Sequence, residues 1–226
     1  MAGLLSVGTW HDEVRHITAF VTGASGFLGG ALARALVQRG QRVRILARRT
    51  SRLDHLRDLE IDVAYGRLED KASLVAPLRG SHIIHHCAAL STDWAPWEAF
   101  WRANVQGVEN ILEAAREAGH VRRFVHISTS DVYGYPAVPC DESHPLVDIG
   151  LSYGRSKILG ERLVWEHHKR TGLPVTVIRP VTMYGPRSKD FAVEIARLLL
   201  KRQMVLIDGG RSRGGFLYVE NAVEGI

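Results

Sequence analysis

The chain has 226 residues, of which 46% are hydrophobic and 23% are charged. That length suits one large domain with a sizeable core, or one domain and part of a second. The net charge of +5 raises the possibility that the chain binds nucleic acid. However, the arginines between positions 39 and 52 are expected to spread over different faces, and no nucleic-acid motif accompanies them. No apolar run approaches the roughly 20 residues of a membrane helix. We therefore expect neither a nucleic-acid partner nor a membrane span.

The first sixteen residues are interpreted as a loose N-terminal extension. Asp12 and Glu13 follow its brief apolar stretch and no lysine or arginine precedes it, which is not the pattern of a secretory signal. Cys87 and Cys140 show no metal-ligand spacing, and neither do the adjacent histidine pairs at 85–86 and 167–168. These features predict reduced thiols, a cytoplasmic location and no metal site.

A buried strand, a glycine turn and a helix follow one another from residue 17. Residues 17–21 form a short apolar run, three glycines come next, and residues 31–37 continue with helical spacing. Gly23 would turn the chain off the strand, Gly26 would let backbone approach a pyrophosphate, and Gly29 would let the helix pack close to the sheet. Free N–H groups at the start of the helix would face the phosphates. This stretch predicts a dinucleotide site.

Strand and helix patterns alternate along most of the chain. Runs typical of strands lie at 17–21, 43–47, 62–65, 83–87, 123–128 and 175–179, and helical stretches lie near 28–39, 71–78, 97–118 and 152–170. Such alternation indicates βαβ units. We therefore predict an α/β fold of the Rossmann type, a doubly wound parallel sheet with helices on both faces.

The end of the second expected strand is basic, because Arg48 and Arg49 follow Ala47 directly. Enzymes that prefer NAD usually carry an acidic residue here, which binds the ribose 2′-hydroxyl. A basic side chain suits a 2′-phosphate instead, so NADP is the predicted cofactor and NAD the alternative. Arg48 is the expected contact because it comes first off the strand. The competing interpretation is that both arginines are solvated surface.

Tyr153 and Lys157 lie four residues apart on an expected helix and so share one face. A free tyrosine titrates near ~10, too high for ready proton exchange at neutral pH. A neighbouring ammonium, together with a positive nicotinamide ring, would favour the phenolate. A hydroxyl at a neighbouring strand end would then orient a substrate oxygen.

Four motifs occur together at suitable intervals. They are a Gly-x-x-Gly-x-x-Gly run from Gly23, a His-x-Ala-Ala run that ends at Ala89, a Ser-Thr-x-x-Val-Tyr-Gly run from Ser128, and Tyr-x-x-x-Lys from Tyr153. Over roughly residues 17–226 the chain resembles the extended short-chain dehydrogenase/reductase superfamily, that is, the NAD-dependent epimerase/dehydratase family. The resemblance implies Thr129, Tyr153 and Lys157 as the catalytic set.

The resemblance also implies where the cofactor and substrate bind. Arg67 stands where the family usually has an aspartate that reads the adenine amine, which leaves the adenine to the backbone around Leu68. Asn104 matches the asparagine that braces the sheet near the lysine. Trp94 is expected to form a wall of the substrate pocket, next to Thr129. The implied dinucleotide contacts are Gly23, Ser25, Gly26, Phe27, Leu28, Gly29, Arg48, Leu68, Ala88, Ala89, Ser128, Tyr153, Lys157 and Pro180.

The same resemblance divides the chain into an extension (1–16), a dinucleotide-binding domain (17–180) and the start of a substrate lobe with a returning segment (181–226). An Arg-Pro-x-x-x-Tyr-Gly-Pro run marks the passage between the last two. Extended members usually continue for about another hundred residues, so we expect an incomplete lobe. An open apolar cleft there would favour self-association, for example as a homodimer.

Three functions remain open from the sequence. The first is an NADP-dependent reductase or dehydrogenase acting on a carbonyl or secondary alcohol, similar to dihydroflavonol reductases and 3β-hydroxysteroid dehydrogenases. The second is a nucleotide-sugar epimerase, whereas Ser130-Asp131 in place of Asp-Glu disfavours a dehydratase. The third is a non-catalytic dinucleotide-binding protein, which the presence of both Tyr153 and Lys157 disfavours.

Overall fold

The structure is a computed structural model that describes residues 17–92, 94–188, 192–211 and 214–226. The extension expected at residues 1–16 lies outside the described residues. No helix in the described ranges combines the length and the hydrophobicity that crossing a membrane requires.

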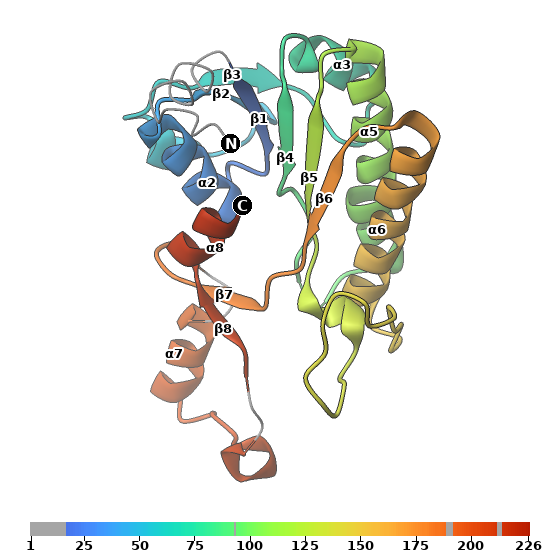
Figure 1. Cartoon of the computed structure of the whole chain (residues 1–226). Coiled ribbons are helices and arrows are strands. Elements are labelled where there is room, and N and C mark those ends of the chain that lie inside the picture. Colours follow the sequence, from blue (N-terminus) through green and yellow to red (C-terminus); the bar gives the residue numbers. More distant parts are fainter. Residues whose placement is uncertain (1–16, 93, 189–191, 212–213) are drawn as a thin grey trace, which may run out of the picture.

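Six parallel strands form the main sheet, in the order β3-β2-β1-β4-β5-β6 (Figure 1). The chain runs outwards from β1 to one edge and then from β4 to the other, which is the doubly wound arrangement. The predicted Rossmann-type fold is therefore confirmed. Predicted and observed strand ends agree to within one residue; the strands are β1 (Thr18–Thr22), β2 (Arg42–Ala47), β3 (Asp62–Tyr65), β4 (Ile83–His86), β5 (Arg123–Ile127) and β6 (Val175–Ile178).

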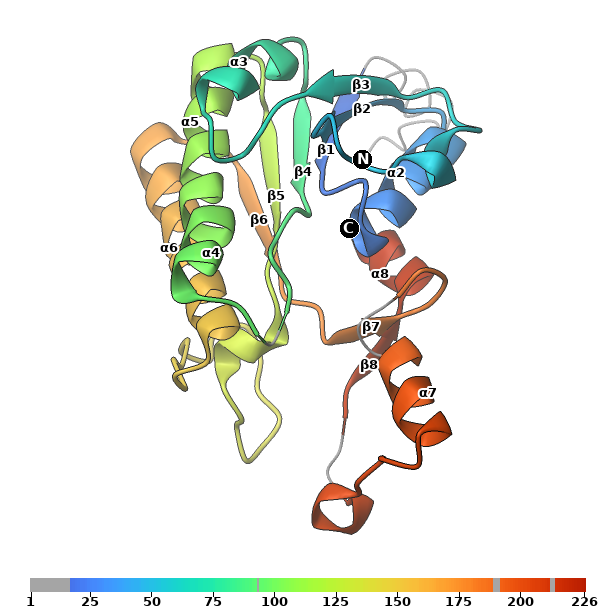
Figure 2. The same ribbon diagram turned by 180° about the vertical axis from the view of Figure 1, so that it is seen from behind.

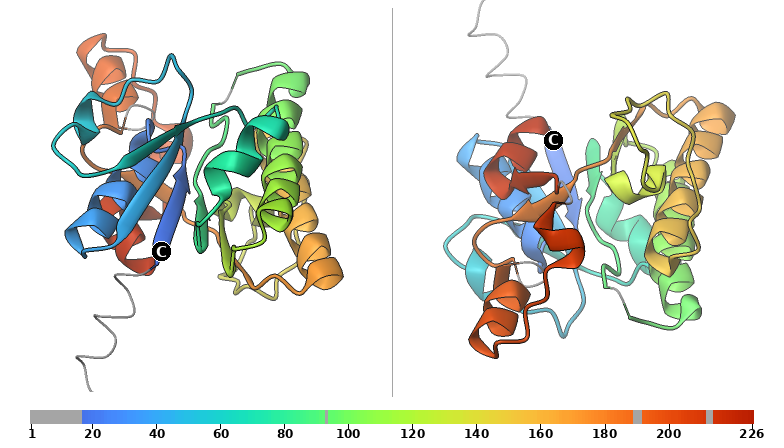
Figure 3. Two further views of the ribbon diagram at one scale, coloured as in Figure 1. Left: turned by 90° about the horizontal axis from the view of Figure 1, so that it is seen from above. Right: turned by 90° about the horizontal axis from the view of Figure 1, so that it is seen from below.

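Helices cover both faces of this sheet (Figures 2 and 3). Side chains alternate along β1, so Ala19 and Val21 pack into one apolar core while Phe20 packs into the other. The first core lies under α2 (Phe27–Gln38) and α8 (Val219–Gly225), and the second under α3 (Ala72–Leu78), α5 (Gly107–Ala118) and α6 (Ser152–Thr171). Shorter helical pieces are α4 (Trp97–Phe100), η1 (Asp54–Leu56), the π-helical η2 (Trp101–Gln106), η3 (Ser130–Tyr133) and η4 (Ile207–Gly210).

A small second lobe lies beyond the carboxyl ends of the strands (Figure 1). In it, β7 (Thr182–Tyr184) pairs in parallel with β8 (Phe216–Tyr218), and α7 (Ala192–Leu200) accompanies them. The chain then returns, because α8 buries Val219, Ala222 and Val223 in the core beside α2. Several large apolar side chains of the lobe are exposed, and the self-association expected from them stays a prediction: Leu199, Leu200, Val205, Leu206 and Phe216.

Candidate active site

One cavity of about 540 Å³ opens at the carboxyl ends of the main strands. The glycine turn after β1, the ends of β2 to β5 and the first turns of α6 contribute its walls. Apart from Pro180, every residue predicted to contact a dinucleotide lines this cavity. The carbonyl of Pro180 accepts a hydrogen bond from the Ser130 amide at 2.9 Å, just beyond the carboxyl end of β5. Ligands in open α/β sheets bind at this edge.

The glycine turn has the geometry of a phosphate cradle. Gly23 adopts φ +74°, and a Cβ there would lie 2.8 Å from the Ala88 nitrogen, so only glycine fits without strain. A Cβ on Gly29 would lie 2.5 Å from the Gly23 oxygen, so the close approach that Gly29 permits is between α2 and the turn, whereas the sequence predicted a close approach to the sheet at this position. The Gly26 amide is used inside the turn, where it donates to the Gly23 oxygen at 2.9 Å. No side chain caps α2, so the free amides that can face an anion begin at Phe27.

The ends of β2 and β3 form the basic end of the cavity. Arg48 lines it, whereas Arg49 lies with its guanidinium 5.2 Å from the ring centre of Tyr65. Arg67 also lines the cavity and pairs with Glu69, with 3.6 Å between Nε and Oε2. Ser51 and Glu69 also line the cavity, which was not predicted from the sequence, although both follow strand ends closely.

Tyr153 and Lys157 line the opposite end, on one face of α6 as their spacing predicts. Lys157 is 2% exposed, and its Nζ donates to the Ile127 oxygen at 2.6 Å. Burial lowers the pKa of Lys157 to about 8, an effect that the Glu161 carboxylate partly offsets. The ammonium therefore titrates close to neutral pH, in the range where it can influence a neighbouring phenol.

Two neighbouring hydroxyls differ in their availability. Thr129 does not line the cavity, and its Oγ1 accepts a hydrogen bond from the Asp131 amide at 3.3 Å as the cap of η3. Ser128 does line it, and its buried Oγ has no hydrogen-bond partner within the described part of the chain. The catalytic role given to Thr129 stays a prediction. Trp94 is 91% exposed and does not line this cavity, and its expected place in the wall of the substrate pocket stays a prediction.

Asn104 braces the site through a feature that the sequence did not reveal. The helix predicted over 97–118 is interrupted by the π-helical η2, which carries Asn104. The Asn104 amide accepts from the Leu90 nitrogen at 2.8 Å and donates to the Leu90 oxygen at 3.0 Å and to Ser156 Oγ at 2.9 Å. It thus ties the loop after β4 to the helix turn beside Lys157. Such π-helical turns frequently occur at functional sites.

Comparisons with known proteins agree with this geometry. A model of the NAD dependent epimerase/dehydratase family matches residues 19–226. The chain belongs to this family. The resemblance inferred from the motifs is thereby confirmed. Within the residues that the structure describes, no group of three or more His, Cys, Asp or Glu side chains is arranged to hold a metal ion.

Several relatives are of named function. The chain is 35% identical to 4-hydroxy-2-methyl-3-oxo-4-farnesyl-3,4-dihydroquinoline-1-oxide ketoreductase of Stigmatella aurantiaca, over 92% of this chain and 62% of that protein. It is also 35% identical to a putative dihydroflavonol 4-reductase of Synechocystis, over 85% of this chain and 59% of that protein. The solved structure of DesIV, a dTDP-glucose 4,6-dehydratase from Streptomyces venezuelae with NAD bound, superposes with a TM-score of 0.83 at 28% identity, over 92% of this chain and 70% of that one. The chain therefore spans between 59% and 62% of the length of these two curated relatives.

Proposed function

We propose that the cavity binds a nicotinamide dinucleotide and that the chain belongs to an oxidoreductase acting on a carbonyl or secondary alcohol. The observation that carries this is the meeting of the glycine turn with Tyr153 and Lys157 in a single cavity. The residues present fit such a cofactor, because no side chain caps α2, Gly23 leaves no room for a side chain, and the buried Ser128 oxygen has no hydrogen-bond partner among the residues that the structure describes. The cofactor, when bound, supplies or accepts the hydride.

Tyr153 holds the proton that moves to or from the substrate oxygen in this proposal. The Lys157 ammonium supports the phenolate by its charge, and its hydrogen bond to the Ile127 oxygen keeps Nζ near the cavity floor. In this proposal Thr129 orients the substrate oxygen from beside the cavity, and its neighbour Ser128 lines the cavity itself. Residues 17–180 form the dinucleotide-binding domain and 181–226 the beginning of the substrate lobe. The two free thiols, Cys87 and Cys140, support a location in a reducing cytoplasm.

Two of the curated relatives favour reduction over epimerisation, since one is a ketoreductase and the other a putative dihydroflavonol 4-reductase. An epimerase or another nucleotide-sugar enzyme remains the second candidate because the fold superposes well on a sugar-nucleotide dehydratase. Purification separates the two: a retained NAD that resists exchange favours the epimerase, whereas freely exchanging NADPH favours the reductase.

Replacing Tyr153 tests the proposed chemistry. We expect Tyr153→Phe to lower the turnover of NADPH with a panel of carbonyl substrates by about 10²- to 10⁴-fold, because the variant loses the proton donor but keeps the ring. The affinity for the dinucleotide, measured by calorimetry, should stay close to that of the parent. Thr129→Val in the same assay tests the orienting hydroxyl. Turnover by Tyr153→Phe at the parent rate would exclude the proposed mechanism.

Arg48 is proposed to set the preference for NADP over NAD. It is the arginine of the β2 end that lines the cavity, and a guanidinium can hold the 2′-phosphate with charge-assisted hydrogen bonds. Arg48→Ser should weaken NADP binding by about 10- to 100-fold and leave NAD binding nearly unchanged. Arg49→Ser is the matched control, because Arg49 lies over Tyr65 instead. Equal losses for both cofactors would contradict the assignment.

A further inference from the structure

Three successive carbonyls of the glycine turn accept hydrogen bonds from side chains that come from outside the turn. His55 Nε2 lies 3.0 Å from the Ala24 oxygen. The Arg187 guanidinium donates to the Ser25 oxygen at 3.3 Å and to the Gly26 oxygen at 3.5 Å. A carbonyl accepts only, so the His55 ring presents its Nε2 proton there. We call these two side chains and their contacts the outer clasp.

A fourth glycine makes room for the outer clasp. Gly30 follows the Gly-x-x-Gly-x-x-Gly run and is not part of it. A Cβ on Gly30 would lie 2.7 Å from His55 Nε2, 2.9 Å from the Ala24 oxygen and 3.0 Å from Arg187 Nη1. Any other residue at this position would push both side chains away from the turn. Gly30 therefore makes room for the outer clasp and not for a ligand in the cavity.

The backbone of Arg187 is itself unusual. Arg187 follows β7 and adopts φ +73°, a left-handed conformation that is uncommon for a residue with a side chain. Such strain persists where the surrounding structure determines it, and it is an indication of a local task. In this conformation the Arg187 guanidinium, which belongs to the second lobe, contacts the oxygen of Gly26, a residue 161 positions earlier in the sequence.

We propose that Arg187 is a positioning residue for the cofactor phosphates, acting from the second lobe through the outer clasp. The peptide unit whose oxygen faces Arg187 is the one whose nitrogen belongs to Phe27, the first free amide of α2. A cation at that oxygen holds the plane of the peptide unit and polarises its N–H toward the cavity. Phosphate affinity thus depends on the lobe's first strand staying docked beside the turn. This inference rests on the proposed function, namely that the cavity binds a dinucleotide.

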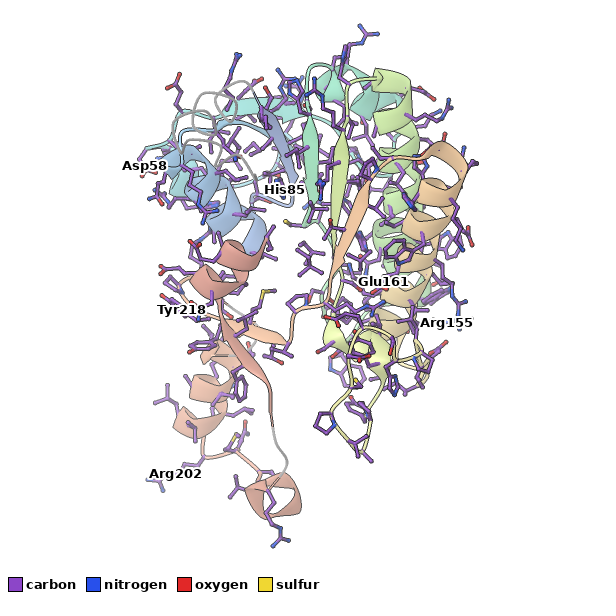
Figure 4. All side chains as sticks on the ribbon, in the orientation of Figure 1. Asp58, His85, Arg155, Glu161, Arg202 and Tyr218 are labelled. Atoms are coloured by element: carbon purple, nitrogen blue, oxygen red, sulfur yellow. The ribbon has the colours of Figure 1, made fainter. Side chains whose placement is uncertain are left out.

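The test uses Arg187→Gly, with Arg202→Gly as its matched control. Glycine adopts a positive φ without strain, so both variants relieve the backbone while only the first removes the clasp. Arg202 has φ +54° and lies at the far end of the lobe (Figure 4). Calorimetric titration with ADP-ribose, which carries the pyrophosphate but no nicotinamide, should show a Kd that is about threefold to tenfold higher for Arg187→Gly and unchanged for Arg202→Gly.

Further readouts separate positioning from a merely structural role. The Kd for NADP should rise by the same factor as that for ADP-ribose, kcat at saturating cofactor should not change, and Arg187→Lys should recover part of the affinity. Parent-like affinity in Arg187→Gly, or an equal loss of affinity in both glycine variants, would overturn the proposed role of the outer clasp in phosphate binding while leaving the proposed function intact. Failure of the parent chain to bind ADP-ribose at all would overturn the proposed function and the clasp with it.

Discussion

Lowering the pH from about 7.5 to about 5 is expected to remove about 4 kcal/mol of folding stability through His85 and His86, and more through His126, because these three histidines of the sheet are buried in their neutral form. His85, His86 and His126 are 6%, 1% and 0% exposed. Burial lowers the pKa of His85 to about 4 and that of His86 to about 3, with the nearby Lys157 adding to the effect at His86. Burial, Lys157 and the neighbouring His86 together hold the pKa of His126 well below its usual value.

The sign follows from proton uptake. In the unfolded chain these histidines bind protons as the pH falls through about 6.5, whereas in the folded chain they stay neutral to much lower pH. The unfolded state therefore holds more protons throughout this window, and stability decreases with falling pH. Each histidine that stays neutral down to about pH 5 contributes a loss of about 2 kcal/mol, and domains are stable by only about 5–15 kcal/mol in total. Urea unfolding at a series of pH values measures the slope.

His126→Leu isolates one of the three contributions. Both ring nitrogens of His126 lack a partner among the described residues, so the substitution removes no hydrogen bond. The ring stacks against His86 at 5.6 Å and against Phe124 at 6.4 Å between centroids. We expect the loss between about pH 7.5 and 5 to be smaller in this variant than in the parent chain, because a residue that cannot bind a proton replaces one whose pKa burial lowers. A parent-like slope in His126→Leu would contradict the explanation.

The main sheet could be predicted because its signals are local. Parallel strands covered on both faces appear as short apolar runs, and the glycines after β1 mark the turn to α2 within a few residues of sequence. The spacing of Tyr153 and Lys157 likewise fixes their common helix face before any tertiary contact is known. Each of these predictions depends on residues close together in the chain, where the periods of strand and helix apply directly.

The parts that sequence could not supply depend on distant contacts. Asn104 lies in a π-helical turn and bonds to Leu90 and Ser156, and helical spacing predicts neither the turn nor these contacts. Thr129 and Ser128 are neighbours in a motif, yet only the fold shows which oxygen is committed to a cap. Arg187 reaches the glycine turn from the second lobe, and no period in the sequence relates the two.

The buried ion pair between Glu161 and Arg179 is another such contact, and breaking it should lower the stability of the fold strongly. Glu161 lies on α6 facing the sheet side (Figure 4), and the side chains of Glu161 and Arg179 are 0% and 14% exposed. Arg179 donates to both carboxylate oxygens, from Nε at 3.0 and 3.2 Å and from Nη2 at 2.7 Å. Its Nη1 also donates to the Tyr133 hydroxyl at 2.7 Å, so the pair joins the end of β6 to α6 and η3.

Arg179→Met is expected to lower the free energy of unfolding by about 3–5 kcal/mol, because it leaves the Glu161 carboxylate buried without its partner. Replacing both residues, as in Arg179→Met with Glu161→Leu, should recover most of this loss, since the desolvation cost of the charges disappears together with their attraction. Glu194→Gln is the control: its pair with Arg197 is exposed on both sides, and a change below about 1 kcal/mol is expected. Additive losses in the double variant would contradict this account.

The double variant also separates stability from catalysis. Glu161 lies one helical turn after Lys157, and its carboxylate raises the pKa of that ammonium against the effect of burial. Without the carboxylate, Lys157 should lose its proton at a pH below about 8. As the pH is raised, turnover in a variant that folds well should therefore begin to decrease at a lower pH than in the parent chain. A pH profile of kcat measures this shift. Recovery of stability together with a displaced profile would show that the pair serves the charge of Lys157 rather than the strength of the fold.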